Sequence, residues 1–280
     1  MGVTRLDKNR EKTEEESFGL KLKKGVKTVV DKISKVFFPN NIKCLICGRD
    51  LPAKQDIEFC SKCEAKLERI DKCCVRCGAK LVAEEKFCLN CQNNKMEFDI
   101  ARGVFLFDGE MKNLIHNFKY NNKPFIASTL AHCLADFYKG LDWKVDMVIP
   151  VPSSKETLKE RGYNQALLLA KKFCELTNLE LHTDILVKSK HTKQQANLGF
   201  EERQKNLADS FSVDLKFRPL LRGKTILIID DVITTGSTAS ECAKILKKRG
   251  AERVVVLAVA RAYLQIPVQS DLKNAKSFVN

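Results

Sequence analysis

The segment from Thr225 to Gly250 constrains the possible folds of this chain more than any other stretch. It opens with a continuous apolar run, Ile226 to Ile229, which is typical of a strand buried on both faces of a parallel sheet. Two acids follow this run, then a short loop of hydroxyl residues, and then a stretch with helical spacing that ends at Gly250. Because ligands of parallel sheets bind at the carboxyl ends of strands, this order predicts an α/β fold with its ligand site in the loop.

The loop has the composition of an anion site. It consists of hydroxyl residues around one glycine: Thr234, Thr235, Gly236, Ser237 and Thr238. Glycine lets the backbone approach an anion, and the hydroxyls and the N–H groups of a helix start donate hydrogen bonds to it. The preceding Asp230 and Asp231 would repel a phosphate unless a ribose diol or a magnesium ion lay between them. The segment therefore predicts a cradle for a phosphorylated sugar.

This acid pair and loop resemble the signature of type I phosphoribosyltransferases, which bind 5-phosphoribosyl-1-pyrophosphate (PRPP). The resemblance implies that Asp230 and Asp231 lie along the ribose hydroxyls, with magnesium, and that loop 234–238 holds the 5-phosphate. A phosphoacceptor receiver domain also has paired acids at a strand end. Most of such a domain follows the pair, however, and only residues 232–280 remain here. A buried strand with an ordinary polar turn is the other alternative.

Twelve cysteines in 280 residues point to metal binding, since a reducing compartment keeps thiols free. Eight of them form two quartets of paired Cys-x-x-Cys knuckles: Cys44, Cys47, Cys60 and Cys63, then Cys74, Cys77, Cys88 and Cys91. This spacing is that of structural zinc sites, which are closed because no coordination position stays open. Two zinc ions in tandem ribbons are expected, with Cys73 outside the second site. The three remaining cysteines lie in apolar helical contexts and are expected in the core: Cys133, Cys174 and Cys242.

Composition and charge exclude some classes of protein. No apolar run approaches the length of a membrane span, and the polar opening of the chain lacks a secretory signal, so a cytoplasmic location is expected. The formal net charge of +14 suggests a nucleic-acid partner. Half of it falls in residues 96–280, however, where a polyanionic substrate such as PRPP would bind. The charge is therefore not independent evidence for DNA binding.

The chain divides into four segments. Residues 1–40 are expected to form a polar arm and an amphipathic helix, which packs on the protein's own body or, alternatively, attaches it to the periphery of the inner membrane. A double zinc ribbon over 41–95, an α/β domain over 96–265 and a tail over 266–280 follow. In the α/β domain, strands are expected near 98–107, 145–149, 185–187, 226–229 and 254–260, and helices near 111–118, 125–138, 166–176 and 239–249. Their alternation predicts a mainly parallel sheet with helices on both faces.

Several separated motifs make the resemblance more specific. They are Phe107-Asp-Gly, Lys119-Tyr120, Pro150-Val-Pro, Arg161-Gly-Tyr-Asn-Gln165, and Gln195-x-x-Leu198 followed by Arg203 and Asn206. In this order, together with the Asp230 loop, they resemble the ComF family of competence-associated phosphoribosyltransferase-like proteins, which also carry amino-terminal zinc ribbons. The match covers about Val36 to Arg261.

The resemblance also implies further site residues. Phosphoribosyltransferases bind pyrophosphate in the loop after the second strand, where the sequence has Ser153 and Ser154, and Lys119 and Arg161 are the candidate cations. Arg161 could instead anchor a surface loop. The polar segment with Gln195 and Arg203 is either a flexible catalytic lid or a plain linker.

Three function classes are open at this point. The first is a transferase that moves the ribosyl group of PRPP, with magnesium, to an acceptor that no residues identify. The second, implied by the ComF resemblance, is a protein that handles single-stranded DNA during natural competence, with proteins of the DNA-uptake machinery as partners. The third is a regulator that senses PRPP without turnover. The complete acid and loop motifs favour the first and third classes, and the residues do not decide between those two.

Overall fold

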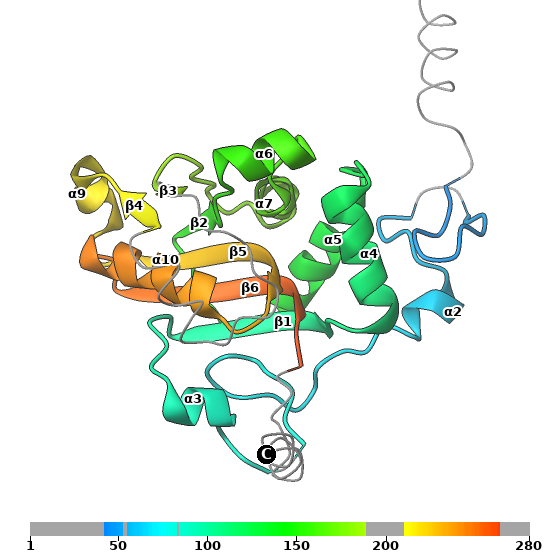
Figure 1. Cartoon of the computed structure of the whole chain (residues 1–280), viewed down its shortest axis with the longest axis horizontal. Helices are drawn as coiled ribbons and strands as arrows, with labels where there is room; N and C mark the ends of the chain where they lie inside the picture. Colours follow the sequence, from blue (N-terminus) through cyan, green and yellow to red (C-terminus); the bar gives the residue numbers. More distant parts are fainter. Residues whose placement is uncertain (1–41, 53–54, 83, 189–209, 264–280) are drawn as a thin grey trace, which may run out of the picture.

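The computed structural model describes residues 42–52, 55–82, 84–188 and 210–263. Within this part of the chain, a parallel sheet of four strands lies at the centre, in the order β1–β6–β5–β2 (Figure 1). Its strands are β1 (Ile100–Leu106), β2 (Met147–Pro150), β5 (Thr225–Ile233) and β6 (Arg253–Arg261). Helices cover both faces, so the predicted α/β fold is confirmed.

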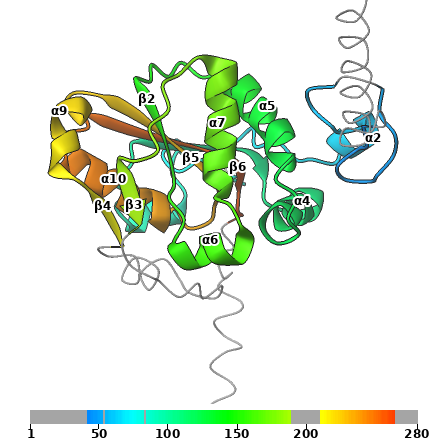
Figure 2. The same ribbon diagram turned by 90° about the horizontal axis from the view of Figure 1, so that it is seen from above.

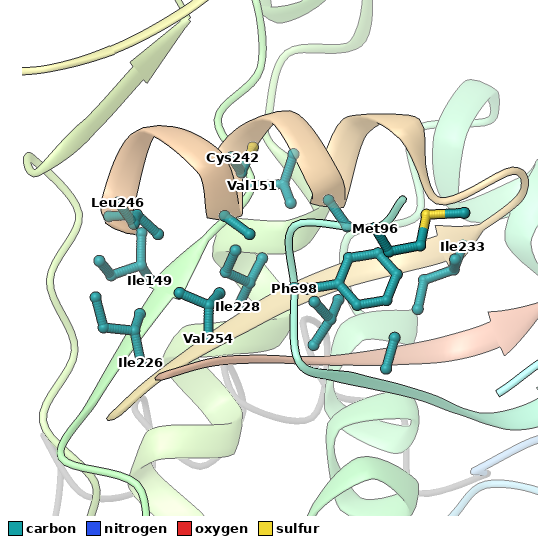
Figure 3. Close-up of a cluster of buried hydrophobic side chains, with 14 of the residues drawn as sticks. Met96, Phe98, Ile149, Val151, Ile226, Ile228, Ile233, Cys242, Leu246 and Val254 are labelled. Carbon is teal, nitrogen blue, oxygen red and sulfur yellow. The ribbon is translucent and has the colours of Figure 1, made fainter. Parts of the chain in front are cut away.

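Alternation along the strands assigns each side chain to one face of the sheet. Ile226 and Ile228 pack in one buried cluster with helix α10 (Ser237–Lys248), as Figure 3 shows. Leu227 and Ile229 pack in a second cluster on the opposite face. That cluster is covered by three helices: α4 (Gly109–Tyr120), α5 (Ile126–Lys139) and α7 (Gln165–Thr177). Because both faces are buried, the central strands read as continuous apolar runs.

Strand β5 is longer than expected. It continues through both acids to Ile233, since Asp230 pairs with Ala258 and Val232 pairs with Ala260 on β6. Ladder hydrogen bonds use the backbone alone, so polar side chains do not end the strand. The two acids therefore lie on the sheet itself, and the loop begins after them.

The expected strand at 185–187 does not join the main sheet. It forms β3 (Leu186–Lys188), which pairs antiparallel with β4 (Phe211–Val213) in a separate two-stranded sheet. Leu186 is buried while Val187 is half exposed, so this short strand has only one apolar face. A central parallel strand needs two such faces.

In the described part of the α/β domain, three short helices were not expected. They are α6 (Lys155–Arg161), the 3-10 helix η1 (Leu215–Phe217) and α9 (Arg218–Leu221). The side chain of Ser154 caps α6 by accepting a hydrogen bond from the Thr157 N–H at 3.2 Å. Helix α6 lies between β2 and α7 and places Arg161 at its last position.

The two cysteine ribbons pack on different faces. The first, with helix α2 (Ser61–Glu64), lies beside α4 and α5 and contributes Phe59 and Leu67 to the helical cluster (Figures 1 and 2). The second, with helix α3 (Leu89–Asn93), lies on the other face, where its four cysteines belong to the cluster that contains Ile226 and Ile228. The second ribbon is thus part of the same core as the sheet.

Some sequence expectations fall outside the described residues. They concern the arm and amphipathic helix of residues 1–40, the segment with Gln195 and Arg203, and the tail 266–280. Cys133, Cys174 and Cys242 are buried, as expected. Across the described ranges, no helix combines the length and the apolar character that crossing a membrane requires.

Candidate functional site

The loop after β5 has the backbone of an anion cradle. Gly236 is the residue before α10 and has φ 85°, which is the left-handed region that favours glycine. Thr235 Oγ1 lies 2.9 Å from Ser237 Oγ and accepts a hydrogen bond from the Ser237 N–H at 3.4 Å. A twelve-residue helix begins at Ser237, so its N–H groups and the positive end of its dipole lie at the loop.

The apolar side chains of Phe98 and Met96 lie against this loop. A Cβ built on Gly236 would lie 3.5 Å from the ring of Phe98 and 3.9 Å from the Met96 sulfur (Figure 3). These are ordinary contact distances, so space does not exclude a side chain here. The positive φ is what requires glycine.

The paired acids differ in their surroundings. Asp231 is buried, and its Oδ2 lies 3.0 Å from Lys119 Nζ at the end of α4. The Asp231 N–H donates to Asp230 Oδ1 at 2.8 Å. Burial, and then the negative charge of Asp231, raise the pKa of Asp230 to about 7, although Lys119 and Lys188 oppose this shift. Lys119 is thus the cationic partner of Asp231, whereas the pKa of Asp230 lies near neutral pH.

Lys188 acts electrostatically on Asp230, which was not expected from the sequence. It is the last residue of β3, and its Nζ lies 5.7 Å from the centre of the Phe211 ring. Burial lowers the pKa of Lys188, and the charge of Asp230 opposes that shift. The sequence contains no signal for it, because its position depends on the pairing of β3 with β4.

A second polar group surrounds Arg161. Its guanidinium lies 4.8 Å from the centre of the Tyr120 ring, and Nη2 donates to the Tyr120 hydroxyl at 3.1 Å. Nη1 lies 3.4 Å from Gln165 Oε1. Arg161 Nε and Gln165 Nε2 are both buried, and neither has a hydrogen-bond partner among the described residues. Unpaired buried donors cost free energy, so this pair suits an anionic ligand.

The end of α4 joins the two groups into one site. Lys119 contacts Asp231 and the next residue, Tyr120, contacts Arg161. The Tyr163 hydroxyl donates to the Phe118 carbonyl at 2.5 Å and fixes this end of α4 against the turn after α6. Sequence motifs far apart in the chain, Lys119-Tyr120 and Arg161 to Gln165, are thus brought together.

The two serines after β2 do not lie in an unstructured loop, because a helix begins directly after them. Ser154 is buried and its hydroxyl is engaged as the cap of α6, while Ser153 is half-buried just before it. Asn164 caps α7 and also donates to the Val151 carbonyl at 3.0 Å. This turn is therefore held rigidly beside the β2 end.

Both cysteine quartets have the geometry of zinc sites. Within each quartet the four sulfurs lie within 4.8 Å of one another, and Cys73 belongs to neither. Cys47 and Cys60 sulfurs are 3.8 Å apart, and those of Cys77 and Cys88 are 3.5 Å apart. Tetrahedral zinc with Zn–S bonds of about 2.3 Å requires a sulfur separation of about 3.8 Å. The residues therefore fit zinc, and the expected ribbons are in place.

Backbone donors favour a thiolate in the first quartet. The Cys60 N–H lies 3.4 Å from Cys44 Sγ. Burial raises the pKa of Cys44, but backbone hydrogen bonds from Cys47, Cys60 and Ile46 outweigh it and lower the pKa to about 6. Zinc binds thiolates, so these backbone donors favour metal binding by Cys44.

Reductively purified protein should contain two zinc ions per chain. Cys60→Ser should reduce this to one and unfold the first ribbon, because a three-thiolate ribbon of that size cannot fold without its metal. Cys73→Ser is the matched control, since Cys73 lies next to the second quartet without belonging to it, and it should keep both ions. Metal analysis by plasma mass spectrometry measures the content. One ion or none in the unmodified chain would contradict the two-site assignment.

Comparison with known proteins agrees with both parts of the fold. The phosphoribosyl transferase domain family matches residues 118–267, and the double zinc ribbon domain family matches residues 33–92. Competence protein F of Haemophilus influenzae is 30% identical over 227 residues, which are 79% of this chain and 98% of that protein. DNA utilization protein YhgH of Escherichia coli is 31% identical over 53% of this chain and 66% of that protein.

Among solved structures, glutamine PRPP amidotransferase from B. subtilis, complexed with ADP and GMP, is similar with a TM-score of 0.35. It is 17% identical and the match covers 50% of this chain and 30% of that one. The match to competence protein F along nearly all of that protein, with a phosphoribosyl transferase domain that follows a double zinc ribbon, shows that this chain belongs to the ComF family.

Proposed function

We propose that this protein binds PRPP with magnesium at the carboxyl end of β5. The observation that carries the proposal is the junction at the end of α4, where Lys119 meets Asp231 and Tyr120 meets Arg161. This junction supports a single site made of the acid pair, the anion cradle and the unpaired buried donors. A sugar with a phosphate at one end and a pyrophosphate at the other matches this arrangement.

Each part of the ligand has residues suited to it. Loop 234–238 and the start of α10 receive the 5-phosphate, because a helix N-terminus and a glycine with positive φ form an anion site. Asp230 and Asp231 accept hydrogen bonds from the ribose hydroxyls. Arg161 Nε and Gln165 Nε2 supply donors for the pyrophosphate, beside the rigid turn of Ser153 and Ser154.

Ribosyl transfer follows from this arrangement as the proposed reaction. The bond between the anomeric carbon and the pyrophosphate oxygen breaks, pyrophosphate leaves with the electron pair, and a nucleophilic atom of the acceptor forms the new bond to that carbon. Bound magnesium would neutralise pyrophosphate charge. The chain's own part is to hold the sugar, to offer Arg161 to the leaving group and to compensate Asp231 with Lys119.

A pyrophosphate-release assay tests transfer directly. Protein, magnesium and PRPP are incubated with pooled nucleobases, nucleotides or single-stranded DNA as acceptors. Acceptor-dependent release that is lost in Arg161→Met supports the transferase. Binding of PRPP by calorimetry without release in any pool would favour a PRPP-sensing protein and contradict transfer to these acceptors.

Binding of PRPP with magnesium should strengthen as the pH rises from 6 to 8. Asp230, with its pKa raised to about 7, is protonated below that pH and is then a poor acceptor and a poor magnesium partner. Its contribution should fall by up to about tenfold per pH unit below the pKa. Asp230→Asn should remove that contribution and give a flatter profile.

The measurement is calorimetric titration of the wild type and Asp230→Asn across this pH range. The phosphates of PRPP titrate near pH 6 themselves, so the difference between the two profiles is the relevant quantity. Asp136→Asn, an exposed acid on α5, is the control and should follow the wild type. Parallel profiles for wild type and Asp230→Asn would contradict the role of Asp230.

The raised pKa of Asp230 also affects the stability of the fold. The folded protein keeps the Asp230 proton between the unfolded value of about 4 and the folded value of about 7, so the free energy of unfolding falls as pH rises through this window. Asp230→Asn should therefore raise Tm by a few degrees at pH 8 and change it little at pH 4.

A second candidate function is handling of single-stranded DNA, in the cytoplasm or at the inner membrane, with DNA-uptake proteins as partners. Two observations favour it: the names of the relatives, competence protein F and DNA utilization protein, and an exposed cation–aromatic pair on the second ribbon. There the Arg76 guanidinium lies 5.7 Å from the centre of the partly exposed Phe87 ring. Aromatic rings beside cations are suited to stacked bases.

DNA binding by this protein should prefer single strands, tolerate any sequence and weaken steeply with salt. The reason is that the sequence offers excess basic charge and no recognition-helix motif, and the Phe87 ring is suited to stacking. Fluorescence anisotropy with labelled oligonucleotides at 50 and 200 mM salt measures this, with Phe87→Ala expected to weaken binding severalfold. Tight binding that survives high salt, or a preference for duplex, would contradict the prediction.

A further inference from the structure

Arg261 connects the second cysteine quartet to loop 234–238, which is called the phosphate loop below. It is the last residue of β6 and its exposed fraction is 0%, which is unusual for a charged side chain. Nε donates to the Cys77 carbonyl at 2.9 Å, and Nη2 lies 3.4 Å from Cys77 Sγ. Nη1 donates to the Ile233 carbonyl at 3.1 Å and also to the Thr234 carbonyl. One buried guanidinium thus bonds Cys77 of the second quartet, the last residue of β5 and the first residue of the loop.

A second contact runs between the same two parts. Asn90, on helix α3 beside the ligand Cys91, places its Nδ2 3.4 Å from the Thr235 carbonyl. Nearby, Glu97 lies in the segment that leaves the second ribbon. Its N–H donates at 3.0 Å to the hydroxyl of Ser240, the fourth residue of α10. The second ribbon therefore contacts the loop and the helix that follows it.

These contacts fix which way the loop peptides face. The carbonyls of Ile233 and Thr234 accept hydrogen bonds from Arg261, and that of Thr235 accepts one from Asn90. All three carbonyls therefore point toward Arg261 and the second ribbon. In a planar trans peptide the N–H points opposite to the carbonyl oxygen, so the amides of the next residues turn to the other side. An anion cradle needs its amides turned to the ligand in this way.

We propose that the second cysteine quartet positions the phosphate loop through Arg261 and Asn90, so that metal binding at the quartet and ligand binding at the loop stabilise each other. Loss of the metal frees the Cys77 backbone, which holds Arg261, and the loop carbonyls lose their fixed donors. Coupling of this kind is reciprocal, so a ligand that orders the loop must also slow loss of the metal. The proposal rests on the proposed function for the identity of the ligand, for which ribose 5-phosphate is the probe.

Two measurements test it. The first follows zinc release to a chromogenic chelator in a Cys60→Ser background, where only the second quartet holds metal. Saturating ribose 5-phosphate should slow release at least about fivefold, the low end of typical coupling factors. The second is hydrogen exchange of the amides in loop 234–238 of the full zinc-loaded chain, compared between the wild type and variants that break the link.

The variants isolate the link. Asn90→Ala should speed loop exchange about threefold and weaken ribose 5-phosphate binding by a similar factor, through loss of one hydrogen bond. Gln92→Ala on the same helix is the matched control, because Gln92 bonds the Phe87 carbonyl instead of the loop. Arg261→Lys keeps the charge but cannot bond Cys77 and the loop together, so its effect should exceed that of Asn90→Ala.

The outcomes separate this proposal from the proposed function. If ribose 5-phosphate binds but leaves zinc release unchanged, the coupling is overturned while the phosphate site stands. If ribose 5-phosphate does not bind the wild type, the proposed function fails and loop exchange decides the link alone. In that case faster exchange in Asn90→Ala than in Gln92→Ala supports the link, and equal exchange overturns it.

Discussion

Cys88→Ser should unfold the phosphoribosyltransferase-type domain, whereas Cys60→Ser should leave it folded. Cys88 is buried in the cluster that contains Ile226 and Ile228 of the central strand, and the first quartet is outside that cluster. Structural zinc contributes on the order of 10 to 16 kcal/mol in small zinc domains, which matches or exceeds the 5 to 15 kcal/mol net stability of a typical domain. Without the metal, the three remaining buried cysteines would take up protons, and the zinc–sulfur bonds that hold the ribbon together would be lost.

Circular dichroism during thermal unfolding, together with metal analysis, measures this effect. Cys242→Ser is the matched control, because it makes the same substitution in the same buried cluster at a position outside both quartets. It should cost about 1 to 3 kcal/mol, the penalty of a buried hydroxyl, and keep the fold. A Cys88→Ser protein that unfolds cooperatively near the Tm of Cys242→Ser would show that the second metal is dispensable for the core.

Gly236→Val should lower the affinity for ribose 5-phosphate at least about a hundredfold. A β-branched side chain at φ 85° costs on the order of 1 to 3 kcal/mol of strain, which the chain relieves by moving the loop out of the cradle geometry. Strain and lost amide donors act together on the same ligand.

The control for strain alone is Gly223→Val. Gly223 has φ 71°, a Cβ there would meet nothing within 4 Å, and it precedes the start of β5, at the opposite end from the loop. It should lose stability to a similar degree and keep full affinity. Calorimetric titration, after circular dichroism has shown that both variants are folded, measures the difference.

The sequence predicted those features that depend on local pattern. The apolar run before Asp230 and the hydroxyl loop after it predicted the strand, loop and helix, and the Cys-x-x-Cys spacing predicted the two quartets. Spacing suffices there because both sulfurs of a knuckle, and both ends of a tight loop, are fixed by a few neighbouring residues.

Features that depend on long-range packing could not be predicted in the same way. Lys119 was expected among the pyrophosphate cations, and the structure places it 3.0 Å from Asp231, since the length and direction of α4 decide what its last turn reaches. Arg261 bonds Cys77 across 184 positions of sequence. No periodicity marks a buried guanidinium whose partners are backbone carbonyls.

The different surroundings of the two acids could not be predicted from the sequence either. Asp230 and Asp231 are adjacent and chemically identical, but successive side chains of a strand point to opposite faces. Asp231 therefore meets Lys119, whereas desolvation and the charge of Asp231 raise the pKa of Asp230 to about 7. Only the sheet and the helices packed on it distinguish the two positions.

Titration calorimetry of the wild-type protein with PRPP and magnesium is the most direct test of a phosphoribosyl site at the end of β5. We expect saturable binding at one site per chain, with competition by ribose 5-phosphate. We also expect at least tenfold weaker binding in Asp231→Asn, which loses the charge that the ribose hydroxyls and magnesium require. Equal affinity in the wild type, Asp231→Asn and Gly236→Val, or no binding by the folded wild type, would contradict a phosphoribosyl site at the end of β5.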